Sequence, residues 1–270
     1  MTGVTDDELY RQYETVNVYR RGAGAKLVLN RPERMNAWNA QFARDLLDAI
    51  QKAGDDPEIR ALAITGAGRA FSSGADLKEG HQGGLTDVYS RLTEQYHPII
   101  TGLRTIPKPV LAAVNGPAAG IGLSLALACD LVVASESAYF LLAFVNIGLV
   151  PDGGSSLFVP SRVGFTRAAE MAMLGERLNA PKALEWGLIN RVWPDDEFAA
   201  QADALLDRLA AGATRSYAGT KRQLNRWVYE QMQGQLEFEA GIQQEMAASG
   251  DFAEGIAAFL DKRPPRFTGA

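Results

Sequence analysis

Three glycine-rich loops contain the residues best suited to chemistry. Each follows a predicted strand, and their sequences are Ala70-Phe-Ser-Ser-Gly-Ala-Asp-Leu-Lys, Asn115-Gly-Pro-Ala-Ala-Gly-Ile-Gly-Leu-Ser and Gly148-Leu-Val-Pro-Asp-Gly-Gly-Ser-Ser. Glycine lets the backbone approach a ligand closely or adopt a positive φ, and a helix that begins at such a loop exposes unpaired N–H groups. The loops are therefore candidate sites for an anion or an oxyanion, although three tight turns in a compact fold would show the same composition.

Other catalytic patterns fit the sequence less well. The Gly-x-Gly at 120–122 has Leu125 at the third position of the dinucleotide-binding fingerprint, which argues against a Rossmann site. No serine lies in the Gly-x-Ser-x-Gly elbow of the serine hydrolases. His81 and His97 lack the spacing of metal ligands, so we expect no metal site and interpret both histidines as surface or helix-packing residues.

Length and composition limit the classes of protein that remain. A chain of 270 residues that is 47% hydrophobic can bury a sizeable core, as one domain or as one domain with an appendage. The single cysteine, Cys129, lies in an apolar run and is predicted to be a buried, reduced thiol. No apolar run reaches the roughly 18 residues of a membrane span, and the acidic N-terminus does not resemble a signal peptide, so we expect a cytoplasmic protein. The net charge of −5 argues against a nucleic-acid partner.

Strand and helix patterns alternate along the first two thirds of the chain and predict an α/β core. Residues 1–195 are expected to form this core, and residues 196–270 a helical region. The predicted strands are 16–19, 26–29, 61–65, 110–114 and 131–134. The predicted helices are 38–53, 86–104, 120–128, 166–174, 181–187, 197–211, 214–231, 235–248 and 251–260.

Taken together, the three loops resemble those of the crotonase family, the enoyl-CoA hydratases and isomerases. The resemblance begins at Leu29-Asn-Arg-Pro-Glu-Arg-Met-Asn-Ala and continues to Lys262-Arg-Pro-Pro-Arg-Phe-Thr-Gly near the C-terminus. Within that family the chain is most similar to acyl-CoA isomerases of phenylacetate degradation and to Δ3,Δ2-enoyl-CoA isomerases of fatty acid metabolism. The segments that carry this similarity are the third loop and Ala183-Leu-Glu-Trp-Gly-Leu-Ile.

The resemblance implies a spiral of ββα units followed by a C-terminal helical region that joins subunits into a homotrimer or a dimer of trimers. It also implies an acyl-CoA substrate, with coenzyme A entering as part of the thioester and no tightly bound cofactor. The backbone N–H groups of Ala75 and Ile121 would form an oxyanion hole, with Gly120 in the substrate pocket. The residues matching the coenzyme A contacts of the family are Arg34, Met35, Ser73, Asp76, Leu77, Lys78, Phe259 and Lys262.

One departure from the family pattern bears on the reaction. Hydratases of the family hold water between two glutamates, whereas this chain has Ser124 and Phe144 at those positions of the substrate pocket, which makes efficient hydration doubtful. Asp152 is the acid that remains, and one carboxylate suffices to shift a double bond. Its apolar neighbours Leu149 and Val150 are expected to raise its pKa above the usual value of about 3.9.

Other readings stay open from the sequence alone. One is a hydratase, or a lyase or thioesterase of the same family, that uses Glu79 or Asp130 as its base. Another is a scaffold that binds coenzyme A without turnover, because a fold can persist after catalysis is lost. Favouring the isomerase, we expect Asp152 to act as the acid and base, with Ala75 and Ile121 binding the thioester oxygen.

Overall fold

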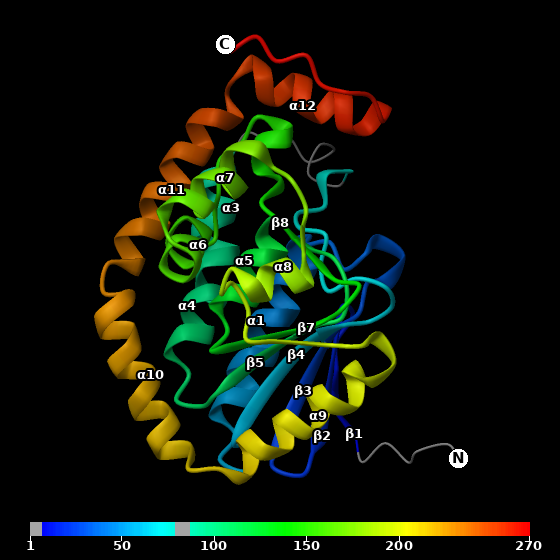
Figure 1. Ribbon diagram of the computed structural model, residues 1–270, viewed down its shortest axis with the longest axis vertical. Coiled ribbons are helices and arrows are strands. Elements are labelled where there is room, and N and C mark those ends of the chain that lie inside the picture. Colours follow the sequence, from blue (N-terminus) through cyan, green and yellow to red (C-terminus); the bar gives the residue numbers. More distant parts are fainter. Residues whose placement is uncertain (1–6, 79–86) are drawn as a thin grey trace.

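A seven-stranded sheet forms the centre of the protein in the computed structural model, which describes residues 7–78 and 87–270 (Figure 1). Its first three strands pair antiparallel, and every later pairing, from β3 to β10, is parallel. Parallel strands β4 and β5 deliver the loops that follow them to the same edge of the sheet. The strand order is β1 (Glu8–Gln12), β2 (Val16–Arg21), β3 (Gly24–Leu29), β4 (Ala61–Gly66), β5 (Val110–Val114), β7 (Leu131–Ser135) and β10 (Arg191–Trp193).

A second sheet of three short strands lies beside those loops. It contains β6 (Ala118–Ala119), β8 (Tyr139–Leu141) and β9 (Leu178–Asn179). Isolated bridges pair Ser72 with Ala118 and Trp38 with Ala75. The small sheet and its bridges therefore tie the loops after β4 and β5 to each other.

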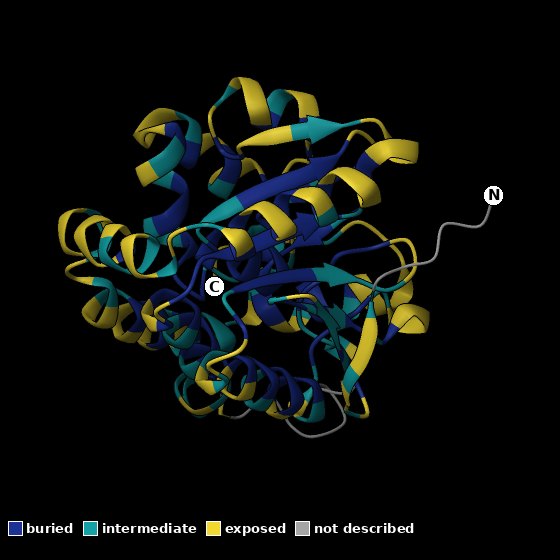
Figure 2. Ribbon diagram, turned by 90° about the horizontal axis from the view of Figure 1, so that it is seen from below, coloured by how far each residue is buried: buried dark blue, intermediate teal, exposed yellow. Residues whose placement is uncertain are grey.

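Helices cover both faces of the large sheet. On one face, α9 (Asp195–Ala211) packs its apolar side chains on alternate residues of β4, β5 and β7. On the other face, α1 (Ala40–Asp55), α4 (His97–Thr105) and α5 (Ile121–Ala128) share the larger core with the opposite side chains of the same strands. The strands are accordingly dark in Figure 2, whereas the helices that cover them are exposed along their outer sides.

The remaining helices lie along the side of the core and across one end of the molecule (Figure 1). In Figure 1, α10 and α11 run one after the other along one side, and α12 lies across the end beside η3. The bounds are η1 (Pro32–Arg34), α3 (Val88–Arg91), η2 (Leu92–Tyr96), η3 (Ala143–Ile147), α6 (Ser155–Val163), α7 (Phe165–Leu174), α8 (Ala180–Glu185), α10 (Thr214–Val228), α11 (Met232–Ala247) and α12 (Gly250–Asp261).

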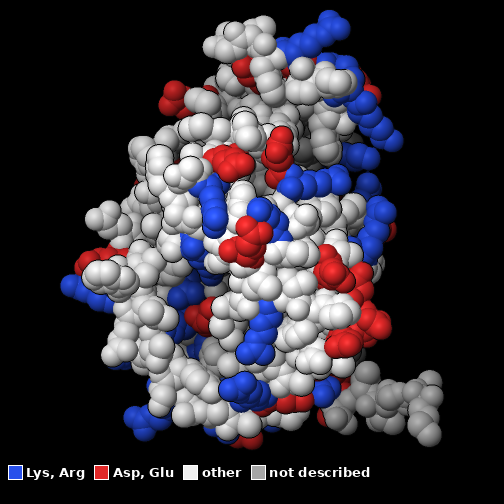
Figure 3. All heavy atoms as spheres, in the orientation of Figure 1, with Lys and Arg blue, Asp and Glu red and all other residues white. Residues whose placement is uncertain are grey.

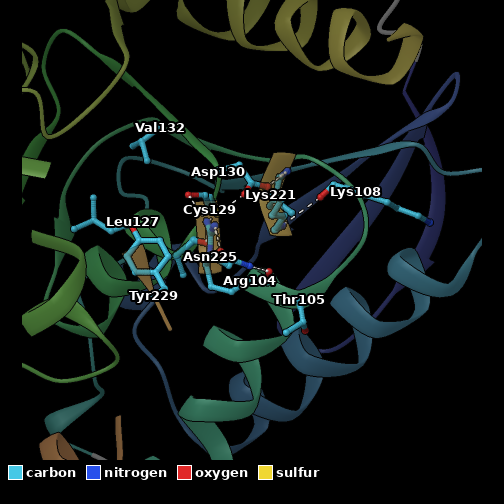
Figure 4. Close-up of polar contacts among 12 residues, drawn as sticks. Arg104, Thr105, Lys108, Leu127, Cys129, Asp130, Val132, Lys221, Asn225 and Tyr229 are labelled. Carbon is cyan, nitrogen blue, oxygen red and sulfur yellow. Dashed lines mark hydrogen bonds and ion pairs between the residues drawn. The ribbon is translucent and has the colours of Figure 1, made fainter. Parts of the chain in front are cut away.

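Buried charges fasten α10 to the core (Figure 4). The Lys221 ammonium lies 2.8 Å from the Asp130 carboxylate, which also pairs with Arg104 at 3.1 Å. Asn225 on α10 accepts from the Arg104 guanidinium and donates to the Arg104 carbonyl at 2.7 Å. Arg104 in turn donates to the carbonyl of Ala128, so the same cluster caps the C-terminus of α5.

The α/β class and the helical C-terminal region predicted from the sequence are confirmed, and the five predicted strands lie within β2, β3, β4, β5 and β7. The predicted helix 86–104 is instead divided into α3, the π-helical turn η2 and α4, and its first residue lies outside the described residues. The sequence misses β1, β6, β8, β9, β10 and α6. α9, which begins at residue 195, packs on the sheet. The division of the chain at that residue stays a prediction.

Candidate active site

One pocket brings the three glycine-rich loops together. It lies between the loop that follows β4, the N-terminus of α5 and the loop that follows η3. The predicted site residues that line it are Ser73, Ala75, Leu77, Gly120, Ile121, Phe144 and Asp152. The other residues of its wall are Gly74, Tyr96, Ala143, Ile147 and Leu149, so the wall is largely apolar.

The first loop leaves the N–H of Ala75 unbonded. Trp38 donates its N–H to the Gly74 carbonyl at 2.8 Å, and the Asp76 N–H donates to the Trp38 carbonyl at 2.8 Å. These bonds hold the residues on both sides of Ala75, whose own N–H has no acceptor within residues 7–78 and 87–270. Gly74 has a φ of 95°, and a Cβ there would lie 2.9 Å from the Ala119 carbonyl oxygen, so glycine is required at this position.

The second loop offers a matching donor at the start of α5. Gly120 precedes the helix with a φ of 52° and a ψ of −130°, and its N–H donates to the Leu141 carbonyl at 3.0 Å. Ile121 is the first residue of α5, so its N–H has no acceptor within the helix, and it has none elsewhere in the described part of the chain. A Cβ on Gly120 would lie 3.9 Å from the Gly74 Cα. Two free N–H groups thus come from adjacent backbones in one pocket, as an oxyanion hole requires.

Asp152 supplies the one acidic side chain among the described residues of the pocket wall. The residue is only 6% exposed. Its Oδ2 accepts a hydrogen bond from Nε2 of Gln243 at 2.8 Å. Its Oδ1 is buried and has no hydrogen-bond partner among the described residues. This unpartnered oxygen is free to take up or release a proton.

Burial raises the pKa of Asp152 to about 8. The nearby negative charge of Glu239 contributes to this rise, whereas the hydrogen bond from Gln243 acts in the opposite direction. The expected direction of the shift agrees with the structure, which adds Glu239 to the apolar neighbours as a cause. A carboxyl that titrates near neutral pH can both accept and return a proton.

Ser124 lies beneath the Asp152 loop, and the structure does not bring it into the pocket wall. Its hydroxyl donates to the main-chain carbonyl of Asp152 at 2.8 Å, as does the hydroxyl of Ser155. Gly153 follows with a φ of 61°, and a Cβ there would lie 2.3 Å from Cδ1 of Ile121. Ser124 therefore holds the backbone that carries the acid, whereas Phe144 lines the pocket itself.

Two residues of α11 contact the same loop and are not identified from the sequence. Glu239 accepts the N–H groups of Gly154 at 2.7 Å and Ser156 at 3.0 Å, and Gln243 bonds to Asp152. Their spacing of four residues places them on one face of the helix. The sequence shows two polar residues at this spacing. It does not show that they are buried or what they contact.

The residues predicted to contact coenzyme A divide between the pocket and the surface. Ser73 and Leu77 line the pocket, and the Ser73 N–H donates to the Met35 carbonyl at 3.0 Å. The Asp76 carboxylate pairs with Arg31 at 3.2 Å, so it already has an ionic partner within the chain. Met35 and Asp76 therefore support the loop without belonging to the described pocket wall.

The other predicted contacts of coenzyme A lie outside the pocket wall. Arg34 and Lys78 are exposed near the first loop, and Phe259 and Lys262 are exposed at the end of α12. In Figure 3 cations and acids are mixed over most of the face shown, and Lys and Arg side chains gather at the upper right, beside α12 and the C-terminus. The four predicted contacts are accessible to a charged ligand, but none of them lines the pocket.

Asp130, one of the alternative bases, lies away from the pocket. It follows the C-terminus of α5, whereas the pocket is at the N-terminus of that helix. Its carboxylate is held by Lys221 and Arg104 (Figure 4). The structure therefore speaks against Asp130 as the base. Glu79, the other alternative, and His81 lie outside the described residues.

Metal and thiol chemistry find little support. Within the described residues, no group of three or more His, Cys, Asp or Glu side chains could hold a metal ion. Cys129 is buried, and burial raises its pKa to about 12, which keeps the thiol protonated. His97 is buried in α4, where burial lowers its pKa to about 4. None of the helices in the described part of the chain has the length and apolar character needed to span a membrane.

Known proteins resemble the chain over nearly its whole length. A family model described as enoyl-CoA hydratase/isomerase matches residues 21–270. A probable enoyl-CoA hydratase of Rhodobacter capsulatus is 42% identical over 257 residues, which cover 95% of this chain and 99% of the relative. A 1,2-epoxyphenylacetyl-CoA isomerase of Escherichia coli is 39% identical over 246 residues, which cover 90% of this chain and 94% of the relative.

A solved structure gives the same result for the fold. The crystal structure of an enoyl-CoA hydratase from Mycobacterium avium subsp. paratuberculosis superposes with a TM-score of 0.86 at 39% identity, covering 95% of this chain and 100% of that one. Sequence and fold therefore indicate the same family. The chain belongs to the enoyl-CoA hydratase/isomerase family, the crotonase family.

Proposed function

We propose that this enzyme shifts a double bond along the acyl chain of an enoyl-CoA. Its family uses coenzyme A thioesters and includes both hydratases and isomerases among the relatives. The observation that carries the proposal is Asp152, a single carboxyl in the described pocket wall, with one oxygen free of partners. Ser124 and Phe144 stand in place of the paired glutamates that hold water in hydratases of the family. The Ser124 hydroxyl is hydrogen-bonded to the main-chain carbonyl of Asp152.

The proposed reaction is a proton transfer through a dienolate. The Asp152 carboxylate removes a proton from the carbon between the thioester carbonyl and the double bond. The electron pair of that C–H bond moves into the carbonyl, and the resulting negative oxygen is bound by the N–H groups of Ala75 and Ile121. Asp152 then returns the proton to the far carbon of the former double bond, which leaves the double bond conjugated to the thioester. No water and no other reactant are consumed.

The pocket wall supports an apolar acyl group. Phe144, Tyr96, Ile147 and Leu149 surround the space next to Asp152. We therefore propose aromatic or medium-length acyl groups as substrates. The isomerase relative of Escherichia coli, whose name specifies a 1,2-epoxyphenylacetyl thioester, is consistent with an acyl group that carries a six-membered carbon ring.

Coenzyme A would lie along the rim formed by the first loop and the cations near it. We propose that Arg34 and Lys78 bind its phosphates, with Phe259 and Lys262 contributing from the end of α12. We further propose that the enzyme is a homotrimer or a dimer of trimers, in which α12 of one subunit can approach the pocket of the next.

The alternative functions differ in the products that they predict. A hydratase would add water to crotonyl-CoA, and a thioesterase would release free coenzyme A. A scaffold without turnover would bind acyl-CoA and change none of these substrates. The donors of Ala75 and Ile121, unbonded within the described chain, favour turnover over the scaffold.

The first test compares the wild type with Asp152→Ala on 3-enoyl-CoA and 2-enoyl-CoA thioesters of several lengths. We expect the wild type to convert 3-enoyl substrates to the conjugated 2-enoyl form, seen as a rise in absorbance of the conjugated thioester. Loss of the acid and base should lower kcat by about 10²- to 10⁴-fold, without weakening the binding of coenzyme A.

The matched control is Asp196→Asn, which removes a carboxylate from the exposed start of α9. This variant should retain full isomerase activity. Hydration of 2-enoyl substrates by a protein indifferent to Asp152→Ala would contradict the proposal and favour a hydratase with another base.

A further inference from the structure

We propose that α11 belongs to the acid–base apparatus, with Gln243 and Glu239 as positioning residues that orient Asp152 and control when its carboxyl holds a proton. The inference rests on the proposed function, in which Asp152 moves the substrate proton. It assigns to two residues of the C-terminal helical region a part in the reaction, in addition to any part of that region in assembly.

Gln243 determines which carboxyl oxygen of Asp152 can exchange a proton. Its Nε2 donates to Oδ2 at 2.8 Å, and its Oε1 accepts the Val150 N–H at 3.4 Å, so both ends of the amide are engaged. Gln243 is only 1% exposed, which leaves it little freedom to turn away. Because Oδ2 is occupied, Oδ1 is the oxygen that can exchange a proton with the substrate.

Glu239 places a second carboxyl close to the first. It is 3% exposed and is held by the N–H groups of Gly154 and Ser156, directly after the loop that carries Asp152. Among the described residues, no Lys or Arg side chain contributes a compensating charge to either carboxyl. Two acids with no cationic partner therefore share one buried site, and a charge on one opposes ionisation of the other.

The other elements around Asp152 add little charge. All side chains of α5 and η3 are uncharged. η2 contributes Tyr96, whose phenol is buried and whose pKa is raised by that burial, so it stays neutral. Among the described residues, Glu239 is thus the charged group that acts on the Asp152 carboxyl. Burial raises the pKa of Glu239 to about 7.

Gln243 and Glu239 act on Asp152 in opposite directions. The hydrogen bond from Gln243 stabilises the carboxylate and lowers the pKa of Asp152, whereas a negative Glu239 destabilises the carboxylate and raises it. Glu239→Gln should therefore move the acid limb of the kcat/KM profile to lower pH, and Gln243→Leu should move it to higher pH. Each displacement is expected to be on the order of one pH unit. A residue that only packed would change activity without displacing the limb.

The experiment combines pH profiles with carboxyl ¹³C NMR titration of Asp152 in the same proteins. Glu245→Gln is the matched control, because Glu245 is an exposed acid on the same helix and does not contribute to the Asp152 carboxyl. We expect this control to leave both the profile and the NMR titration unchanged. Opposite displacements in Glu239→Gln and Gln243→Leu would support the proposal; displacements in the same direction, or none, would overturn it.

The NMR titration separates this inference from the proposed function and does not depend on the variants folding. In the wild type, coupled carboxyls should titrate in two steps that appear in the signals of both Asp152 and Glu239. A single step at Asp152 overturns the inference even if Asp152→Ala is inactive. Conversely, coupled titration in a protein that does not need Asp152 for turnover would overturn the proposed function alone.

Discussion

At the scale of single residues, the raised pKa that suits Asp152 to proton transfer also lowers the stability of the fold as pH rises. Its pKa is about 8 in the fold and near 3.8 when unfolded, so between these values the native state binds more protons than the unfolded chain. The free energy of unfolding must then fall as pH rises through this range. Asp152→Asn removes this effect, so the inactive variant should become more stable than the wild type as pH rises from about 4 to 8.

Thermal unfolding measured across that pH range tests this prediction. Each kcal/mol gained should raise Tm by roughly 2–4 °C for a chain of this size. The Tm difference between Asp152→Asn and wild type should be smallest near pH 4, where the folded carboxyl is protonated and the unfolded carboxyl is only beginning to ionise. Asp196→Asn, at an exposed site, should show no such trend. A difference that does not change with pH would mean that Asp152 is not protonated in the fold.

At the scale of elements, α5 connects the pocket to the charge cluster that holds α10. Its N-terminus presents the Ile121 N–H, and its C-terminal carbonyls accept from Arg104. Asp130→Asn would leave Lys221 and Arg104 buried without their anion, and breaking a buried ion pair costs about 3–5 kcal/mol. We therefore expect a large loss of stability from a residue that lies outside the pocket.

Chemical denaturation and turnover together check the role of Asp130. Glu185→Gln is the matched control, because it breaks the exposed pair with Lys182 at 2.9 Å and should cost at most about 1 kcal/mol. Activity per folded molecule should survive in Asp130→Asn. A folded Asp130→Asn protein without turnover would instead revive Asp130 as a candidate base.

Elements formed by local patterns were predictable, and those defined by distant partners were not. Strands such as β5 are continuous apolar runs, whereas β10 has three residues and exists because it pairs with β7 more than fifty residues earlier. The site follows the same division. Asp152 and the glycines are in short motifs, but the bond from Gln243 joins residues 91 positions apart, and no local pattern specifies such a contact.

At the scale of the whole molecule, several large apolar side chains of the tail helices are exposed to solvent. Trp227 on α10 is 86% exposed and Phe238 on α11 is 62% exposed, with Leu224 and Phe259 also exposed. Large apolar patches on a protein surface often mark interaction sites. This exposure supports the proposed trimer, because association would remove these side chains from water.

Sedimentation equilibrium of the purified enzyme at micromolar concentration tests the assembly, and we expect the mass of a trimer or a hexamer. Trp227→Glu should weaken association, because a charge buried in an apolar interface without a partner is costly. Gln201→Glu adds the same charge to the exposed side of α9 and should leave the mass unchanged. If the oligomer dissociates and turnover also falls while Asp152 titrates as before, the neighbouring subunit contributes to binding coenzyme A rather than to the proton transfer. A wild-type protein that sediments as a stable monomer would exclude the trimer, and the exposed aromatic residues would then need another partner.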